Sequence, residues 1–437
     1  MSDSWRNEYE RKFTTVDYAA SLVQSNDRVF LGGGTGIPSG FATELGKLAG
    51  KVENVTIYQG YAMGLYDYMK PENMESFHIE TMFVGPMERV CMDWGVAQYK
   101  PMHLSDIPAA GLKANCNRVA FVATPPDENG YMNRSCFGAF LPQKETIERA
   151  ETVIAEINSN TPWVNSDDFK IHVSEVDHII QNDVPLFELP EIEITELEKQ
   201  MANYIAELIP DGATIQLGIG GLANAIGNLL YDKKDLGMHS EVITPSVMRL
   251  VEAGVLNCSK KNFYPGQIIS SFAVGTKEFY EYIDHNDAFK LCDIGWVNTP
   301  EVIGQNDNLI SINNTLMMDL TGQAGSESIG TKQYSGTGGQ VNFIQGAKKS
   351  NGGKSIISLT STYTDKNGKM HSKIMPTLTN GTVVTTSRND VEYVVTEYGV
   401  VNLKLENVKT RVESLISIAH PDFRDELRHE AKKIGWL

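Results

Sequence analysis

The sequence predicts an α/β protein built from two related open domains, each with a mainly parallel sheet. Short β-rich runs alternate with longer helical stretches along the 437 residues, a pattern typical of parallel strands joined by crossover helices. Two similar strand–glycine–helix units recur 186 residues apart. A segment with two prolines and several acids lies between them. We therefore predict domains at residues 1–190 and 191–437, with the active site between them.

The first strand–glycine–helix unit follows Asp27. Residues 28–31 (RVFL) predict a strand, residues 32–40 (GGGTGIPSG) a backbone-rich loop, and the following FATELGKLAG a helix. A further strand, VTIYQG, is expected at residues 55–60. Ligands collect at the carboxyl ends of strands in open α/β sheets. The loop would therefore supply N–H donors to an oxyanion, or it would be a flexible turn.

The domain boundary is expected at residues 183–193, within DVPLFELPEIEITE. Residues 194–208 predict the helix that opens the second half. Residues 324–353 are rich in Gly, Ser and Thr, and loops of this length more often carry function than act as plain linkers.

The second unit contains a glycine turn. Residues 213–217 (ATIQL) predict a strand, GIGG a turn, and LANAIGNLLYDKKDLG a helix. Glycines there let backbone N–H groups approach a ligand, and the helix N-terminus favours an anion. The spelling also fits the dinucleotide fingerprint, because Glu241 follows Gly218 by 23 residues. An NAD-binding dehydrogenase is one alternative, and a tight turn without a ligand is another.

The surroundings of Glu241 weigh against the NAD alternative. A ribose-binding acid should end an apolar strand, whereas here GMHS precedes Glu241 and the apolar pair Val242-Ile243 follows it. We therefore expect Glu241 to start a strand, EVIT, instead of ending one.

Composition narrows the class of protein further. The net charge of −17 disfavours nucleic acid and anionic membranes as main partners. No run reaches the ~20 apolar residues of a membrane helix, and the polar N-terminus predicts no secretory signal, so a cytoplasmic protein is expected. No cluster has metal-ligand spacing, so no metal is predicted. Five scattered cysteines are expected to be small buried apolar residues: Cys91, Cys116, Cys136, Cys258 and Cys292.

Several long phrases resemble the acetyl-CoA hydrolase/transferase family, and most closely its 4-hydroxybutyrate and butyryl-CoA:acetate CoA-transferases. In order along the chain they are TPPDENGYMN (124–133), ATIQLGIGG (213–221), GMHSE (237–241), SIGTKQYSGTGGQVNF (328–343), TTSRNDVEYVVTEYGV (385–400) and IAHPDFRDEL (418–427). The resemblance covers nearly the whole chain. It implies the CoA-transferase fold, acyl-CoA as a substrate with no permanently bound cofactor, a short-chain carboxylate such as acetate as its partner, and a homodimer.

The resemblance also assigns roles by position. Glu241 matches the family's nucleophile. Asn313 matches a residue that binds CoA or stabilises the tetrahedral state, and Gly339 matches a backbone N–H donor to the oxyanion, with Ser335 a weaker match nearby. Lys354 matches a basic residue that contacts CoA. The segment that matches the family's CoA-binding turn comprises Gly218, Ile219, Gly220, Gly221 and Leu222.

The implied chemistry is ping-pong covalent catalysis. Glu241 would attack the acyl thioester, and the expelled thiolate would return to give a glutamyl-CoA thioester. An acyl-CoA hydrolase is the alternative in another class, because it needs the same Glu with a wetter pocket. An NAD enzyme and a catalytically inactive CoA-binding protein are less favoured alternatives than the transferase and the hydrolase.

Two departures from the family pattern lie near the reacting centre. After the glycine turn the family usually reads G-A-I-P-D, whereas this chain has Leu222-Ala223-Asn224 there. After the catalytic Glu the family usually reads M-I/F-S-D-G, whereas this chain has VIT followed by Pro245-Ser246, so that Thr244-Pro245-Ser246 replaces S-D-G. Both bear on the acyl specificity. Two histidines are expected to be structural: His239 by hydrogen bonding instead of acting as a base, and His420 by capping a local turn.

Overall fold

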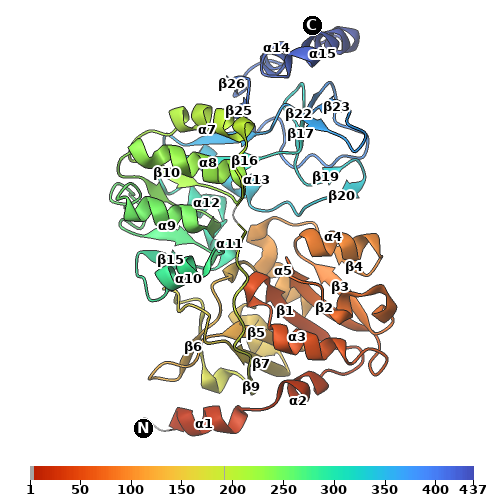
Figure 1. Ribbon diagram of the computed structural model, residues 1–437, viewed down its shortest axis with the longest axis vertical. Helices are drawn as coiled ribbons and strands as arrows, with labels where there is room; N and C mark the ends of the chain where they lie inside the picture. Colours follow the sequence, from red (N-terminus) through yellow and green to blue (C-terminus); the bar gives the residue numbers. More distant parts are fainter. Residues whose placement is uncertain (1–3, 191) are drawn as a thin grey trace. The chain divides into compact units, whose positions relative to one another are not determined.

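The computed structural model describes residues 4–190 and 192–437, and the chain divides into two compact units (Figure 1). Unit 1 is formed by the chain up to Leu189 and by Ile269–Val297, and unit 2 by Pro190–Ile268 and Asn298–Leu437. The first crossing lies at the predicted boundary, whereas the return over Ile269–Val297 is not part of the prediction, since no proline-rich segment marks it. Residues 1–3 of the polar N-terminus and residue 191 of the boundary segment lie outside the described residues.

Unit 1 is built on a seven-stranded sheet in the order β4-β3-β2-β1-β5-β7-β9. Every neighbouring pair in it is parallel. The bounds are β1 Arg28–Gly33, β2 Val55–Gly60, β3 Phe77–Thr81, β4 Ala97–Tyr99, β5 Arg118–Ala123, β7 Thr152–Ile157 and β9 His178–Gln181. The strands predicted at residues 28–31 and 55–60 are confirmed as β1 and β2. Central strands such as β5 are buried along their whole length, as expected for parallel sheets covered on both faces.

Helices and short strands complete unit 1. The helices are α1 Ser4–Lys12, α2 Val16–Ser21, α3 Ser39–Gly46, α4 Pro86–Asp93, α5 Ile107–Ala114, α6 Lys144–Arg149, α10 Lys277–Ile283 and α11 Ile294–Val297. The short strands are β6 Tyr131–Asn133, β8 Lys170–His172, β13 Ile268–Ser270, β14 Phe272–Ala273 and β15 Phe289–Leu291.

The glycine loop after β1 is packed. The amide of Gly34 donates to the carbonyl of Tyr61 at 3.1 Å, and a Cβ on Gly34 would lie 2.5 Å from the ring of Phe137. Residues 32–38 are buried. The alternative of a flexible turn is therefore wrong for this loop, because aromatic rings pack directly on its backbone.

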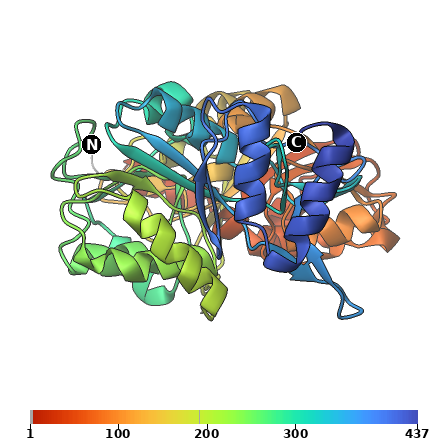
Figure 2. The same ribbon diagram turned by 90° about the horizontal axis from the view of Figure 1, so that it is seen from above.

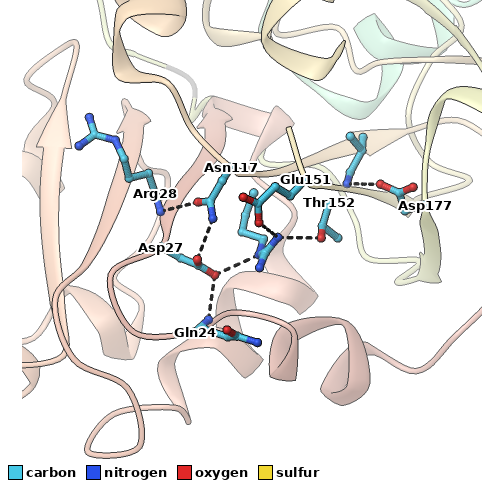
Figure 3. A network of polar contacts seen from close by, with 9 residues as sticks. Gln24, Asp27, Arg28, Asn117, Glu151, Thr152 and Asp177 are labelled. Carbon is cyan, nitrogen blue, oxygen red and sulfur yellow. Dashed lines mark hydrogen bonds and ion pairs between the residues drawn. The ribbon is translucent and has the colours of Figure 1, made fainter. Parts of the chain in front are cut away.

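A polar network joins the amino ends of the central strands of unit 1 (Figure 3). The carboxylate of Asp27 accepts from Asn117 Nδ2 at 2.8 Å and from Arg118 Nε at 3.0 Å, at the start of β5. Arg118 also donates to Glu151 at 3.1 Å and to Thr152 Oγ1 at 2.9 Å, at the start of β7. Asp27 and Arg118 are both buried, so removing Arg118 would leave the buried carboxylate of Asp27 without its cation. The network thus holds β1, β5 and β7 in register at the end of the sheet opposite the glycine loop.

Unit 2 is built on a six-stranded sheet in the order β11-β10-β16-β21-β25-β26. All neighbouring pairs are parallel except β25 and β26, which are antiparallel. The bounds are β10 Thr214–Gln216, β11 Gly237–Met238, β16 Leu309–Asn314, β21 Lys354–Ser358, β25 Tyr393–Thr396 and β26 Gly399–Asn402. The strand predicted at residues 213–217 is confirmed as β10.

The two sheets share their connectivity. From β1 the chain passes to β2 on one side and later to β5, β7 and β9 on the other. From β10 it passes to β11 on one side and later to β16, β21 and β25 on the other. Each glycine turn follows the strand at which the order reverses, which is where open α/β sheets bind ligands. The predicted α/β class with mainly parallel sheets is confirmed, and the shared order supports two related halves.

The strand that follows the second glycine turn is β11, which ends before Glu241. The strand predicted as EVIT is present over its apolar pair alone, directly after Glu241. The apolar pair forms only the short β12, Val242–Ile243, which lies outside the six-stranded sheet. The amide of His239 donates to the carbonyl of Ile215 at 3.2 Å. The hydrogen bonds between β11 and β10 therefore continue past Met238, toward Glu241. A strand therefore does precede Glu241, and the strand pattern around Glu241 does not weigh against the NAD alternative.

The remaining helices of unit 2 are α7 Glu196–Leu208, α8 Gly221–Leu229, α9 Pro245–Glu252, α12 Pro300–Ile303, α13 Gln340–Lys349, α14 Val408–Ser417 and α15 Pro421–Ile434. The last two, dark blue in Figure 2, pack against each other. The predicted helix at residues 194–208 is confirmed as α7, which opens with a capping box of Thr195 and Glu198. No helix of the described residues has the length and apolarity to span a membrane.

The segment predicted as a long functional loop, residues 324–353, is largely ordered into secondary structure. It holds β18 Ala324–Gly325, the β19–β20 hairpin (Ser328–Ile329 and Lys332–Gln333) and helix α13. Further short strands are β17 Met317–Asp319, β22 Thr362–Thr364, β23 Met370–Ser372 and β24 Ile374–Met375. The main stretches without helix or strand are residues 334–339, before α13, and residues 350–353, after it. All five cysteines are buried with free thiols, which confirms that prediction.

Candidate active site

Glu241 lies at the carboxyl edge of the unit 2 sheet, three residues beyond the end of β11. The hydroxyl of Ser240 donates to the carbonyl of Leu217 at 2.9 Å. Leu217 directly precedes Gly218, so Glu241 sits beside the glycine turn. Glu241, the predicted nucleophile, and the predicted glycine turn therefore share one edge of one sheet.

Two N–H donors hold the carboxylate of Glu241. Asn298 Nδ2 lies 3.2 Å from Oε2, and the backbone amide of Gly339 also donates to the carboxylate. A Cβ on Gly339 would lie 1.8 Å from Oε2 and 2.5 Å from Asn298 Nδ2. The φ of Gly339 is −91°, a value that any residue adopts. Glycine is therefore required here by the close approach of the carboxylate.

Burial raises the pKa of Glu241 to about 7, and the hydrogen bonds from Asn298 and Gly339 oppose this rise. Removing a carboxylate from water disfavours its charged form, whereas N–H donors favour it. Glu241 therefore titrates close to neutral pH. Such a pKa suits a group that must ionise to react, and perturbed carboxyl groups of this kind concentrate at functional sites.

The two donors come from helices that pack against each other. Asn298 stands just before α12, and Gly339 is the N-cap of α13. The contact between the two helices depends on Gly346, where a Cβ would lie 2.3 Å from Cγ2 of Ile303. This close packing brings Asn298 and Gly339 to the same carboxylate. Because Gly339 begins α13, the helix N-terminus also favours the ionised form of Glu241.

The segment that leads into Glu241 is fixed by buried side chains. His239 Nδ1 lies 3.3 Å from Asn306 Nδ2, and its ring packs edge-on against Phe343, with the ring centroids 6.1 Å apart. Lys261 donates to the carbonyl of Met238 at 3.0 Å. These contacts confirm the structural hydrogen-bonding role expected of His239. They hold the backbone that leads into Glu241.

The glycine turn has both a conformational and a packing requirement. Gly220 has φ +119°, which strongly favours glycine, and a Cβ on Gly221 would lie 2.3 Å from Oε1 of Glu198 on α7. A Cβ on Gly218 would meet no protein atom within 4 Å. Ile219 is 40% exposed, whereas Leu222 is buried. The turn therefore presents open backbone at Gly218 and Gly220.

Two further predicted site residues, Asn313 and Ser335, lie on different elements of unit 2. Asn313 stands at the carboxyl end of β16, where its Nδ2 donates to Gln216 Oε1 at 3.2 Å, so it neighbours the glycine turn. Ser335 donates through its amide to Glu327 at 3.0 Å and lies in the loop that leads to Gly339.

Lys354 lies at the opposite edge of the sheet from Glu241. It is the first residue of β21 and pairs with Ile310 near the amino end of β16. Its ammonium donates to the carbonyl of Leu208 at 3.0 Å, at the end of α7. A cation there stabilises the helix C-terminus. This placement does not fit the predicted contact with CoA, and Lys354 is left out of the proposed site.

The two departures from the family pattern lie at helix starts. Thr244 is the N-cap of α9 and Pro245 its first residue, a position that proline favours. Asn224 lies in the first turn of α8, where its amide donates to Gly220 at 3.1 Å. His420 accepts from the amide of Asp422 as the N-cap of α15, which confirms its predicted capping role.

The sequence analysis did not name Asn298. Its hydrogen bond to Glu241 spans 57 residues, and no local motif marks it. Among the residues that the structure describes, no three His, Cys, Asp or Glu side chains are grouped to hold a metal ion.

Known proteins match this chain over nearly its whole length, and two family models match its two ends. The N-terminal domain of the acetyl-CoA hydrolase/transferase family matches residues 2–188, and its C-terminal domain matches residues 275–431. A 4-hydroxybutyrate coenzyme A transferase of Clostridium kluyveri is 41% identical, with 98% of this chain and 99% of the relative covered.

Another relative and a solved structure agree with this match. A butyryl-CoA:acetate CoA-transferase of Anaerostipes caccae is 37% identical, with 98% of each chain covered. The crystal structure of RipA from Yersinia pestis superposes with a TM-score of 0.92 at 33% identity, covering 99% of this chain and all of that one.

Proposed function

Because this chain belongs to the acetyl-CoA hydrolase/transferase family, we propose that it transfers coenzyme A from a short-chain acyl-CoA to a carboxylate such as acetate, with Glu241 as the covalent nucleophile. The observation that carries the proposal is the carboxylate of Glu241, held by Asn298 and Gly339 beside an open glycine turn. The names of the two relatives, a 4-hydroxybutyrate and a butyryl-CoA:acetate transferase, favour short linear acyl groups.

The first half-reaction begins on the ionised form of Glu241. One carboxylate oxygen attacks the thioester carbonyl, the carbonyl electrons move onto its oxygen, and collapse of this tetrahedral species expels CoA thiolate. The product is an acyl-glutamyl anhydride. The thiolate then attacks the glutamyl carbonyl and expels the donor's acyl group as a free carboxylate, which leaves Glu241 as a CoA thioester. No proton is gained or lost in either step.

The second half-reaction reverses this order with the acceptor. The incoming carboxylate attacks the glutamyl thioester and expels CoA thiolate, and the thiolate then takes the new acyl group from the anhydride. Glu241 leaves as a carboxylate, ready for another cycle. Because the donor acid departs before the acceptor reacts, the kinetics should be ping-pong.

Coenzyme A is a substrate in this scheme, and the glycine turn is its proposed contact. The open backbone at Gly218 and Gly220 can approach an anionic or amide group of the ligand closely. Asn313 neighbours this turn and is the proposed second contact. Binding energy from parts of CoA far from the thioester can be used to position the reacting carbonyl over Glu241.

The experiment that tests the proposal combines rate measurements with trapping. Purified enzyme is mixed with butyryl-CoA with and without acetate, and acetyl-CoA formation is compared with loss of total thioester. Transfer that far exceeds hydrolysis supports a transferase, whereas acceptor-independent loss would make the protein a hydrolase. Sodium borohydride reduces a glutamyl thioester, so it should inactivate the enzyme only after acyl-CoA is added, with the modification on Glu241.

Two variants of the nucleophile sharpen this test. Glu241→Gln should abolish both transfer and trapping, and Glu241→Asp should lower kcat severely because one missing methylene displaces the carboxylate by roughly 1 Å. Near-normal turnover in either variant would refute the covalent role. We further propose a cytoplasmic homodimer from the family resemblance, and sedimentation of the purified protein tests the dimer.

A further inference from the structure

We infer that a cleft in unit 2 binds a phosphate group, which the guanidinium of Arg388 holds. The cleft has a volume of about 360 Å³ and lies between the turn that joins β17 to β18, residues 377–384, and Trp436 near the C-terminus. Its size suits a small molecule. None of the described residues that line it belongs to the glycine turn or donates to Glu241. This Arg388 cleft is therefore a second site, and the inference goes beyond the proposed function without resting on it.

Arg388 has no counter-ion among the described residues. It is exposed, and neither a hydrogen bond nor an ion pair joins its side chain to another residue in the described parts of the chain. A second arginine lies directly behind it. Arg411 Nη1 donates to the backbone carbonyl of Arg388 at 2.7 Å and to that of Thr321 at 3.2 Å, and its Nε donates to the carbonyl of Glu406 at 3.1 Å. Arg411 is buried, and all three of these acceptors are uncharged.

The turn at Gly322 fixes the two arginines close together. A Cβ on Gly322 would lie 3.1 Å from Arg411 Nη1 and 4.0 Å from Cβ of Arg388, and the φ of +95° at this residue favours glycine. Burial lowers the pKa of Arg411, and the charge of Arg388 lowers it further. Like charges this near to each other repel. An anion bound in the cleft would be attracted by both, so the pair forms a ready-made site for negative charge.

Among the described residues that line the cleft, Asp319 is the one acid. Its carboxylate is buried and bound by its own turn. Oδ1 accepts from the amides of Thr321 at 2.9 Å and Gln323 at 3.0 Å, and Oδ2 accepts from Gln323 Nε2 at 2.6 Å. These donors satisfy the carboxylate without a cation. Two arginines against one acid therefore leave the cleft positive, in a chain whose net charge is −17.

The other groups of the cleft suit a phosphorylated small molecule. The planar fork of Arg388 matches two phosphate oxygens. The hydroxyl of Thr377 and the amide of Asn380 also line the cleft, have no partner among the described residues, and can donate to the remaining oxygens. Trp436 is partly buried against the core and offers an aromatic face to the organic part of the ligand. The phosphate belongs either to coenzyme A itself or to a separate phosphorylated molecule.

The test titrates inorganic phosphate into the full chain at constant ionic strength, with calorimetry and thermal unfolding as readouts. The Tm of the wild type should rise saturably, because a ligand that binds only the folded state stabilises it. Arg388→Ala should raise the Kd for phosphate at least roughly tenfold, since it removes a charge-assisted contact. The matched control is Arg428→Ala on α15, an arginine that pairs with Asp425 at 3.2 Å. It loses the same charge outside the cleft and should bind phosphate as the wild type does.

A second variant tests the cleft while both arginines stay in place. Asn380→Asp puts a carboxylate among the lining groups, so it should abolish phosphate binding by repulsion and by loss of a donor. Its control is Asn367→Asp, at an exposed position between β22 and β23, which should leave the Kd for phosphate unchanged. Equal weakening in a cleft variant and its control would show that phosphate responds to net charge alone, and would overturn the inference.

Two further arms identify the source of the phosphate group. If it belongs to coenzyme A, saturating coenzyme A should abolish the effect of inorganic phosphate, and Arg388→Ala should raise the KM for butyryl-CoA. If it belongs to a separate molecule, the phosphate effect should persist with coenzyme A bound, and this KM should not change. Stabilisation that never saturates, or that chloride reproduces at the same ionic strength, would refute the site. Because the titration needs no turnover, its result is independent of whether the protein proves to be a transferase.

Discussion

Replacing Glu241 with glutamine should stabilise the protein at neutral and alkaline pH, with a gain that disappears in acid. Burial raises the pKa of Glu241 to about 7 from its ordinary 4.5. Between these two pH values the folded protein keeps a proton on Glu241 that the unfolded chain has lost. The free energy of unfolding therefore falls as the pH rises through this window, and above pH 7 the loss stays constant.

The expected size follows from the two pKa values. Their difference corresponds to roughly 3 kcal/mol at about 1.36 kcal/mol per pH unit. Glutamine carries no charge, so the unfolding free energy of Glu241→Gln lacks this dependence. The free-energy gap between the variant and the wild type should therefore widen by roughly 3 kcal/mol between about pH 4.5 and pH 8. Any fixed cost of placing an amide against the donors is the same at both pH values and cancels.

Thermal unfolding at pH 5 and pH 8 measures this gap. Unit 2, which carries Glu241, has about 200 residues, and for a cooperative unit of that size 1 kcal/mol shifts Tm by roughly 2–4 °C. The Tm advantage of Glu241→Gln should therefore be several degrees larger at pH 8. Glu252 is an exposed glutamate of α9 in the same unit, so Glu252→Gln is the matched control and should show no such change.

A Tm advantage that is equal at pH 5 and pH 8 would refute this reasoning. It would mean that Glu241 ionises in the folded protein as it does in water, because the hydrogen bonds from Asn298 and Gly339 offset the desolvation of its carboxylate completely.

Three further predictions test the site directly. The kcat/KM of the wild type should rise with pH to a plateau with a midpoint near 7, because only ionised Glu241 attacks; a flat profile from pH 5.5 to 8.5 would contradict it. Gly339→Ala should lower kcat by at least roughly 10²-fold, since its Cβ would displace the carboxylate; near-wild-type turnover would show that the carboxylate is held otherwise. Gly218→Ala should fold normally, because its Cβ meets no protein atom within 4 Å, and it should raise the KM for acyl-CoA. Gly111→Ala on α5 is the control, and an unchanged KM in Gly218→Ala would exclude the turn from the CoA site.

Local sequence signals predicted much of the fold. The mainly apolar runs at residues 28–31, 55–60 and 213–217 became β1, β2 and β10, because a short β-rich run bounded by turn residues favours a buried strand. Helix α7 was equally legible, since its capping box lies within four residues. The glycines of both turns follow strands directly, which made the turns predictable from consecutive residues, and the phrase around Glu241 was specific enough to select that residue as the proposed nucleophile.

Contacts between segments far apart in the sequence were not predicted correctly. The strand beside β10 is the two-residue β11, and not the apolar pair after Glu241. Two residues are too few for their apolarity to predict a strand, so pairing with a neighbouring strand decides which residues form it. The chain returns to unit 1 over Ile269–Val297 without a composition change to mark the crossing. Lys354, aligned by a short phrase, turned out to cap α7.

The sequence by itself determined the class of fold, the two strand–glycine–helix units and the position of the carboxylate at residue 241, because each depends on a local pattern of consecutive residues. Only the tertiary structure decided what surrounds that carboxylate. The donor from Asn298 comes from 57 residues away, and its direction depends on the packing of Ile303 against Gly346. Such contacts arise from the way whole helices fit together, and no local pattern of residue types encodes that fit.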